Sequence, residues 1–213
     1  MKRRKTSPLH GKGLPAAPSH LLQDILTDAR GINNETLEKV ILLAVEIARE
    51  GREGRKVGTM FVISDSEAVM ANSRCLILDP LMGHPESKRH IDDPDLRETV
   101  KELAQLDGAF VVSDEGIVLS ACRYIDAPSR DVSLPLGLGS RHMAAASITK
   151  LTNAIAIVVS ESSIVRIFDN GEIVSEILPE IWLLSRYSLH LKGPTSAQTE
   201  DHITVISKVE GKG

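Results

Sequence analysis

Residues 154–159 form an unbroken apolar run, Ala-Ile-Ala-Ile-Val-Val. A strand with one face in water alternates apolar and polar residues, whereas an unbroken run is typical of a strand covered on both faces. We therefore predict a central strand here, with helices over both of its faces. Residues 57–63, Val-Gly-Thr-Met-Phe-Val-Ile, have the same character and predict a second buried strand.

Two segments carry apolar residues at helical spacing. Residues 35–50 follow Asn33 and Asn34, either of which can cap a helix, and residues 94–106 follow the capping residue Asp93. Their predicted buried faces are Leu37, Val40, Ile41, Ala44, Val45 and Ala48 in the first helix, and Leu96, Val100, Leu103 and Leu106 in the second.

Two pairs of short apolar segments are each joined by a turn that contains glycine, which is typical of β-hairpins. The first pair is residues 110–113 and 117–121, and the second is residues 164–168 and 172–177. Helices, hairpins and single buried strands that alternate along the chain predict an α/β fold. We expect a single domain with a central mixed, twisted β-sheet flanked by helices.

The length of 213 residues is sufficient for one domain with tails. Residues 1–30 begin with a basic stretch rich in proline and glycine and are predicted to be a disordered tail. Residues 31–190 are predicted to form the domain, which ends in a short helix at 179–190. Residues 191–213 are predicted to be a polar extension, with strand character at 202–209.

Composition argues against several classes of protein. A net charge of -4 and an aromatic content of 3% provide neither the basic field nor the stacking side chains of nucleic-acid-binding proteins. No apolar run approaches the roughly 20 residues that span a bilayer. Cys75 and Cys122 match no metal-binding spacing, and the polar loop at 79–93 with His84 and His90 is predicted to be solvated. We expect a cytoplasmic protein with no membrane and no nucleic acid as partner.

Residues 136–147 combine a glycine-punctuated loop with the start of a helix, for which Ser140 is the predicted cap. Arg141 places a cation in the first helical turn, and His142 adds a second when it is protonated. The helix dipole disfavours cations at this end. A bound anion, most simply a phosphate, would explain them. The alternative is an ordinary helix whose arginine points into water.

Asp107 precedes Gly108 at the entrance of the strand predicted at 110–113. A carboxylate there can face a ligand or a cation, and the glycine lets the backbone come close to either. The alternative is a turn aspartate that bonds its own backbone. Ligands of α/β sheets collect at strand ends beside helix N-termini, but spacing alone does not decide whether Asp107 and Arg141 meet.

These residues resemble the diadenylate cyclase family. The resemblance covers residues 48–177 and depends on Asp-Gly-Ala at 107–109, on Gly-Ser-Arg-His-Met-Ala-Ala at 139–145, and on Ile-Val-Val-Ser-Glu at 157–161. This form of the motifs is most similar to soluble, standalone archaeal members. The resemblance implies an enzyme that condenses two ATP into cyclic di-AMP and two pyrophosphates. It also implies a homodimer in which two ATP-loaded subunits face each other, and it leaves larger oligomers open.

The resemblance further implies roles for single residues. Asp107 would bind the divalent metal, Mn²⁺ or Mg²⁺, with Glu161 as a second ligand, and would activate the 3′-hydroxyl of ATP. Arg141 and His142 would complete the catalytic set and hold the triphosphate together with Ser140. The other implied ATP-binding residues are Gly108, Ala109, Tyr124, Ile125, Gly139 and Ser160.

Three positions depart from the family pattern. Met143 stands where a second arginine is frequent, Ser140 where many members have threonine, and Ser162 where many have a second acidic residue. These departures leave open a catalytically weak regulator that binds ATP or a cyclic dinucleotide. A third hypothesis is a serine acyl enzyme, since residues 147–150 match Ser-x-x-Lys. Ser147 would then lie inside a helix, away from the amides that form an oxyanion hole.

Overall fold

A computed structural model describes residues 32–130, 132–179, 195–200 and 203–208. Within these ranges, no helix is both long and apolar enough to cross a membrane. The helices are α2 (Asn34–Glu50), α3 (Ser66–Ala71), the 3-10 helix η2 (Glu86–Lys88), α4 (Pro94–Leu103) and α5 (Ser140–Leu151). The strands are β1 (Thr59–Ile63), β2 (Ser73–Cys75), β3 (Ala109–Val112), β4 (Val118–Ile125), β5 (Ile155–Val159), β6 (Val165–Asp169), β7 (Glu172–Ile177), β8 (Thr195–Glu200) and β9 (Ile203–Lys208).

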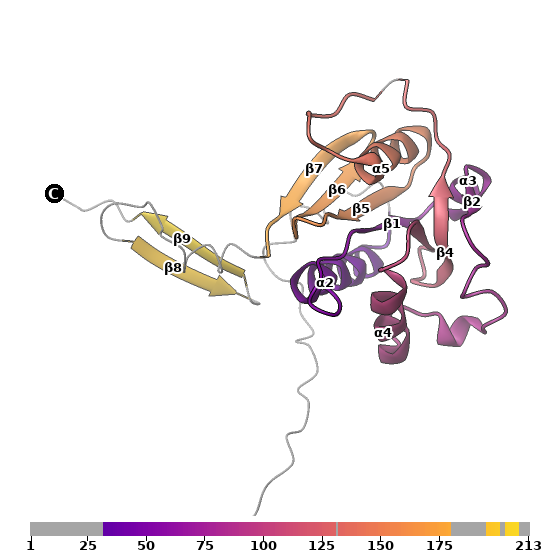
Figure 1. Ribbon diagram of the computed structural model, residues 1–213, viewed down its shortest axis with the longest axis horizontal. Coiled ribbons are helices and arrows are strands. Elements are labelled where there is room, and N and C mark those ends of the chain that lie inside the picture. The colour runs from indigo at the N-terminus through magenta and orange to yellow at the C-terminus, as the bar shows by residue number, and fades with distance from the viewer. Residues whose placement is uncertain (1–31, 131, 180–194, 201–202, 209–213) are drawn as a thin grey trace, which may run out of the picture.

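Seven strands form one sheet in the order β2-β4-β3-β1-β5-β6-β7 (Figure 1). Strand β1 pairs in parallel with β3 and antiparallel with β5, and the remaining neighbours are antiparallel. The sheet is therefore mixed, and the predicted α/β class is confirmed. Strands β8 and β9 form a separate two-stranded antiparallel sheet.

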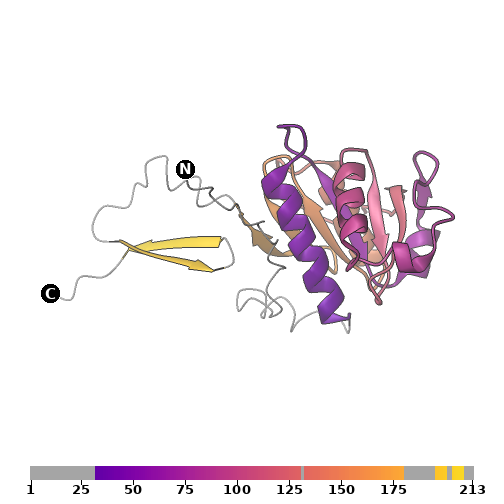
Figure 2. The same cartoon turned by 90° about the horizontal axis from the view of Figure 1, so that it is seen from below.

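Helices cover both faces of the large sheet, and side chains of β1 alternate between them. Phe61 and Ile63 lie in the core cluster with α2 and α4, whereas Met60 and Val62 lie in the cluster with α3 and α5. Figure 2 shows α2 and α4 side by side over one face, and Figure 1 shows α5 over the other. Burial of both faces explains why the central strands are unbroken apolar runs.

Side chains cap two of the predicted helices as expected. Asn33 accepts from the backbone N–H groups of α2, and Asp93 accepts from the N–H of Asp95 in α4. The prediction that Ser140 caps α5 is wrong. Gly139 is the cap, and its extended backbone lets its carbonyl accept from the first turn while no side chain caps the helix. Ser140 is instead the first helical residue.

Several element boundaries differ from the predictions. Strand β4 continues to Ile125, so Tyr124 lies within the strand. Leu106 does not belong to the buried stripe of α4, because that helix ends at Leu103 and Leu106 is 43% exposed. Helix α3 and strand β2 were not predicted, whereas β9 agrees with the strand character at 202–209. The tail at 1–30 and the helix predicted at 179–190, beyond position 179, lie outside the described residues.

Candidate functional site

The pairing of three strands brings the predicted site residues to one edge of the sheet. Met60 lies opposite Ala109 of β3 and Val158 of β5. The residues just before β3 and just after β5 therefore lie at the same edge. These residues are Asp107 and the Ser160–Glu161 pair, and the first turn of α5 reaches the same place.

Asp107 and Arg141 are in contact. The spacing of the two motifs in the sequence did not decide whether they would meet. Arg141 Nη2 lies 2.9 Å from Asp107 Oδ1, and its Nη1 lies 3.6 Å from Glu161 Oε1. The Arg141 side chain is 30% exposed, whereas the two carboxylates are 86% and 73% exposed. A half-buried guanidinium thus holds two carboxylates that face solvent.

Gly58, which the sequence analysis did not single out, gives this guanidinium its space. A Cβ atom at Gly58 would lie 2.9 Å from Arg141 Nη1 and 3.2 Å from Glu161 Cγ. A lone glycine in a strand-like stretch indicates a close approach of backbone and partner. That pattern was visible in Val57-Gly58-Thr59 and could have identified the residue.

A largely apolar cavity of about 580 Å³ lies between β4 and α5. Asp107 and Gly108 stand at one side of it, and Met143 belongs to its lining. Tyr124 is 46% exposed, with the Arg74 guanidinium 4.7 Å from the centroid of its ring. The lining also includes Met60, Leu76, Arg123, Ile125, Ala127, Ser129, Ser140, Arg141, Ala144 and Ser147. Ala109 is not among the lining residues, because it is buried within β3.

A polar cavity of about 390 Å³ lies on the other side of Arg141. Ser140 and Arg141 line both cavities. Ser160 and Ser162 lie in the polar one with their hydroxyl oxygens 2.6 Å apart. The remaining lining residues are Gly137, Leu138, Gly139, His142, Val158, Val159, Glu161 and Arg166.

His142 lies in the polar cavity and is only 7% exposed. Arg166 Nη1 lies 3.1 Å from His142 Nε2. A guanidinium can only donate, so Nε2 accepts and the imidazole proton is on Nδ1. Burial lowers the pKa of His142, and the charges of Arg166 and Arg141 lower it further against the opposing effect of Glu176. At neutral pH His142 is therefore an uncharged member of the site, and the second cation expected at the helix start is absent.

Gly108 is required by the fold itself. It has a φ of +111°, and an added Cβ would lie 2.6 Å from the carbonyl carbon of Cys122. Cys122 has a φ of +55° at a place where the β3–β4 register shifts. The backbone of a bulged β4 thus occupies the space that a side chain at 108 would need.

Two arginines with little solvent exposure near the cavities were missed. Arg166 is the basic residue of β6, set between the apolar residues Val165 and Ile167, a pattern that could have indicated it. Arg123 is 8% exposed and donates to the carbonyl and hydroxyl of Ser73 and to the carbonyl of Met70, which fixes β2 against β4. No pattern in the sequence indicated Arg123.

Two alternative readings find no support. The described residues contain no group of three or more His, Cys, Asp or Glu side chains that could hold a metal ion. The loop at 79–93 is not solvated throughout, because Leu81 and Ile91 are buried. Ser147, proposed as a nucleophile, is 1% exposed and its hydroxyl has no hydrogen-bond partner, whereas Lys150 is exposed. No serine–lysine pair is formed.

Known proteins are similar to this chain in sequence and in fold. The family described as DisA bacterial checkpoint controller nucleotide-binding matches residues 46–173. A protein of Methanocaldococcus jannaschii named diadenylate cyclase is 52% identical over 150 residues, which are 70% of this chain and 47% of that protein. One of Haloferax volcanii with the same name is 40% identical over 164 residues, 76% of this chain and 59% of the relative.

The chain thus spans about half the length of these curated relatives. A solved structure, described as that of a hypothetical membrane spanning protein from Bacillus cereus, has a TM-score of 0.52 and 19% identity. The match covers 73% of this chain and 68% of that one, and it supports the fold.

Proposed function

The chain belongs to the DisA bacterial checkpoint controller nucleotide-binding family, and on that premise we propose that it condenses two ATP molecules into cyclic di-AMP. The observation that carries the proposal is the contact between Asp107 and Arg141, at the boundary between a polar and a largely apolar cavity. A nucleotide has the same division, with a polyanion at one end and a base at the other. The relatives named diadenylate cyclase support this choice of reaction.

The triphosphate would occupy the polar cavity. Arg141 offers it charge-assisted hydrogen bonds, and Ser140 and Ser160 offer hydroxyl groups. Helix α5 begins without a capping side chain and without an acidic residue in its first turn, so its amide groups can also receive an anion. The base would lie in the apolar cavity against Tyr124 and Ile125.

Asp107 and Glu161 would hold a divalent cation, Mn²⁺ or Mg²⁺. Their donor set fits such an ion, because Mg²⁺ is commonly held by one or two carboxylates together with substrate phosphates. Both carboxylates are exposed and share Arg141 as a partner, with Asp107 lining the largely apolar cavity and Glu161 the polar one. When bound, the cation neutralises charge on the phosphates and polarises the attacked phosphorus.

Each subunit would supply one ATP to a reaction that joins two. The 3′-hydroxyl oxygen of one nucleotide forms a bond to the α-phosphorus of the other, and the bond from that phosphorus to the pyrophosphate oxygen breaks. Asp107 orients the hydroxyl and receives its proton, while Arg141 holds the pyrophosphate as charge develops on it. A second such step closes the ring, in which the 3′-hydroxyl of the other nucleotide attacks the α-phosphorus of the first. The two steps together require two subunits face to face.

Mass analysis of the product formed from ATP with Mn²⁺ or Mg²⁺ tests the proposal. A cyclic dinucleotide and two equivalents of pyrophosphate are expected, with a rate per subunit that falls when dilution separates the dimer. Tight ATP binding without product would favour the regulator instead. That alternative gains some weight from Met143 and Ser162, which stand where family members often have charged residues.

A further inference from the structure

The polar cavity contains three ionised side chains, Arg141, Glu161 and Arg166. Glu161 already lies 3.6 Å from Arg141, and the two charges offset each other. His142 is neutral, as shown by its acceptor role toward Arg166. Arg166 is the second guanidinium that lines this cavity, and it enters from β6 and not from α5, with its Nε paired to Glu176 on β7.

Other residues hold the Arg166 side chain in one orientation. Its Nε donates to Glu176 on β7, and its Nη1 donates to His142 Nε2 at 3.1 Å. Nη2 has no hydrogen-bond partner among the described residues, although the side chain is only 12% exposed. Two of the three guanidinium nitrogens thus fix the group, and the third is left to bind a ligand of the cavity that it lines.

We propose that Arg166 is the second cation of the triphosphate site and binds a phosphate oxygen through Nη2. This inference rests on the proposed function, because it takes the polar cavity as the triphosphate site. Fixation by Glu176 and His142 makes the group preorganised, so little side-chain entropy is lost when the phosphate binds. The proposal also assigns a role to His142, because its imidazole accepts from Arg166 and keeps the guanidinium oriented toward the cavity.

Binding of α,β-methylene-ATP, whose pyrophosphate cannot leave, is compared with binding of adenosine by calorimetry. Arg166→Gln removes the cation, and Arg166→Lys restores a charge. Glu176→Gln removes the charge of the β6–β7 ion pair, while its amide oxygen can still accept from Arg166 Nε and keep the guanidinium in its orientation. We expect Arg166→Gln to weaken the analogue by about tenfold or more, the scale of one lost charge-assisted hydrogen bond. Adenosine affinity should stay within about twofold, the lysine variant should recover part of the loss, and Glu176→Gln should bind like wild type.

Three outcomes would overturn the inference. Arg166→Gln could bind the analogue as tightly as wild type, it could lose adenosine and the analogue equally, or Glu176→Gln could reproduce its loss. Each of the last two would mean that Arg166 only supports the pairing of β6 with β7. If wild type makes cyclic di-AMP in these cases, the proposed function stands without Arg166. If wild type binds neither probe, the proposed function falls together with the inference.

Discussion

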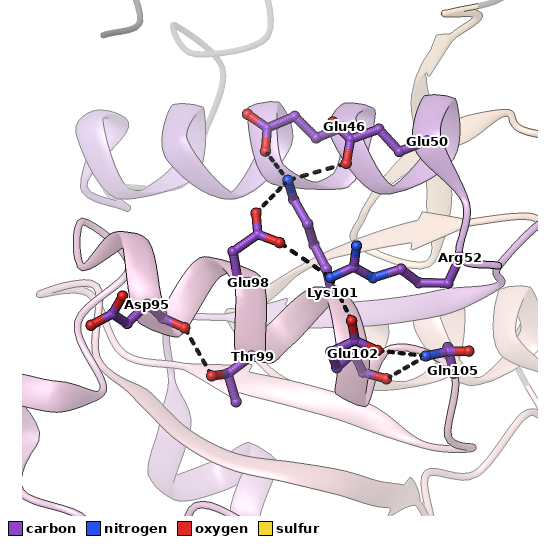
Figure 3. Close-up of polar contacts among 9 residues, drawn as sticks. All are labelled: Glu46, Glu50, Arg52, Asp95, Glu98, Thr99, Lys101, Glu102 and Gln105. Carbon is purple, nitrogen blue, oxygen red and sulfur yellow. Dashed lines mark hydrogen bonds and ion pairs between the residues drawn. The ribbon is translucent and has the colours of Figure 1, made fainter. Parts of the chain in front are cut away.

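Two clusters of ion pairs in this molecule have similar chemistry and different accessibility. Between α2 and α4, Lys101 Nζ lies 3.1–3.2 Å from carboxylate oxygens of Glu46, Glu50 and Glu98 (Figure 3). The Lys101 side chain is 10% exposed. At the opposite side of the sheet, Arg141 holds Asp107 and Glu161, which are 86% and 73% exposed. The first, closed cluster surrounds a buried cation, although Glu50 and Glu98 are themselves more than half exposed. The second, open cluster offers both of its carboxylates to solvent.

The closed cluster keeps its lysine charged despite its burial. Burial acts to lower the pKa of Lys101, but hydrogen bonds to Glu98 and Glu46 and the charge of Glu46 raise it overall. Arg52 extends the cluster by bridging Glu98 and Glu102. Because these groups join two helices and line neither of the two cavities described above, we assign the cluster to stability. The open cluster borders both cavities, so we assign it to function. The following variants test these two assignments.

Asp107→Asn should have the largest effect. It removes the carboxylate that we propose to orient the 3′-hydroxyl, so product formation should fall by about 100-fold or more, the usual scale for a general base. An exposed ion pair contributes only about 0–1 kcal/mol, so the unfolding midpoint should hardly change. Product mass and thermal unfolding measure the two quantities. Asp92→Asn, which removes an exposed partner of Lys39 away from the site, should leave activity unchanged.

Lys101→Met should affect stability and spare activity. The variant leaves three carboxylates without their shared cation, and breaking a buried ion pair costs roughly 3–5 kcal/mol. Since Glu50 and Glu98 are more than half exposed, we expect about 2 kcal/mol, measured by urea unfolding. Lys39→Met, at a lysine 26% exposed, should cost less than about 1 kcal/mol. A loss of catalysis in folded Lys101→Met would contradict the assignment of the closed cluster to stability.

Gly58→Ala should disturb the open cluster without unfolding the chain. The three atoms nearest to the new methyl group belong to the side chains of Arg141 and Glu161 and not to the backbone. These side chains can move, so stability should change by less than about 1 kcal/mol. Displaced phosphate contacts should raise the KM for ATP by about tenfold. The matched variant Gly108→Ala meets the backbone of Cys122 at a positive φ and should destabilise by about 1–3 kcal/mol. Equal stability losses in the two would be inconsistent with this account.

The smallest effect concerns pH. The folded pKa of His142 lies below its ordinary value of 6.5, so the unfolded chain binds the proton more tightly. Stability from this group is fully present above pH 6.5 and falls as pH drops toward the folded pKa. His142→Gln, whose amide oxygen can still accept from Arg166, should lack this component. Urea unfolding of both proteins between pH 7.5 and 5 measures it, and parallel curves would exclude it.

Local patterns predicted the central elements, and contacts between distant segments set the rest. The apolar runs and the caps Asn33 and Asp93 are local patterns that depend on residues close in sequence, and these predictions are confirmed. The short helix α3 and strand β2 escaped prediction because a buried arginine, Arg123, fixes them from 50 residues away. Propensity within six or three residues is too weak a signal by comparison.

The motifs of the site were predictable from the sequence, but its division into a polar and a largely apolar cavity was not. The sequence placed Asp107 and Arg141 at element ends, but only the parallel β1–β3 pairing brings those ends together. Ser140 failed as a cap because Gly139 takes the capping position with an extended backbone and accepts from His142 and Met143, so that Ser140 becomes the first helical residue. Arg166 escaped notice because its contacts come from α5 and β7, which are distant in sequence from one another.

Strand β4 has one residue more than β3 between two pairing points, since Ala109 lies opposite Arg123 and Val111 opposite Ser120. Beyond that surplus residue, Tyr124 is exposed and Ile125 is buried. Deleting one residue there would invert the alternation, which would turn the aromatic ring into the core and the isoleucine outward. Homologous chains should therefore tolerate substitutions in this stretch far better than insertions or deletions, because its length decides which side chain the base would meet.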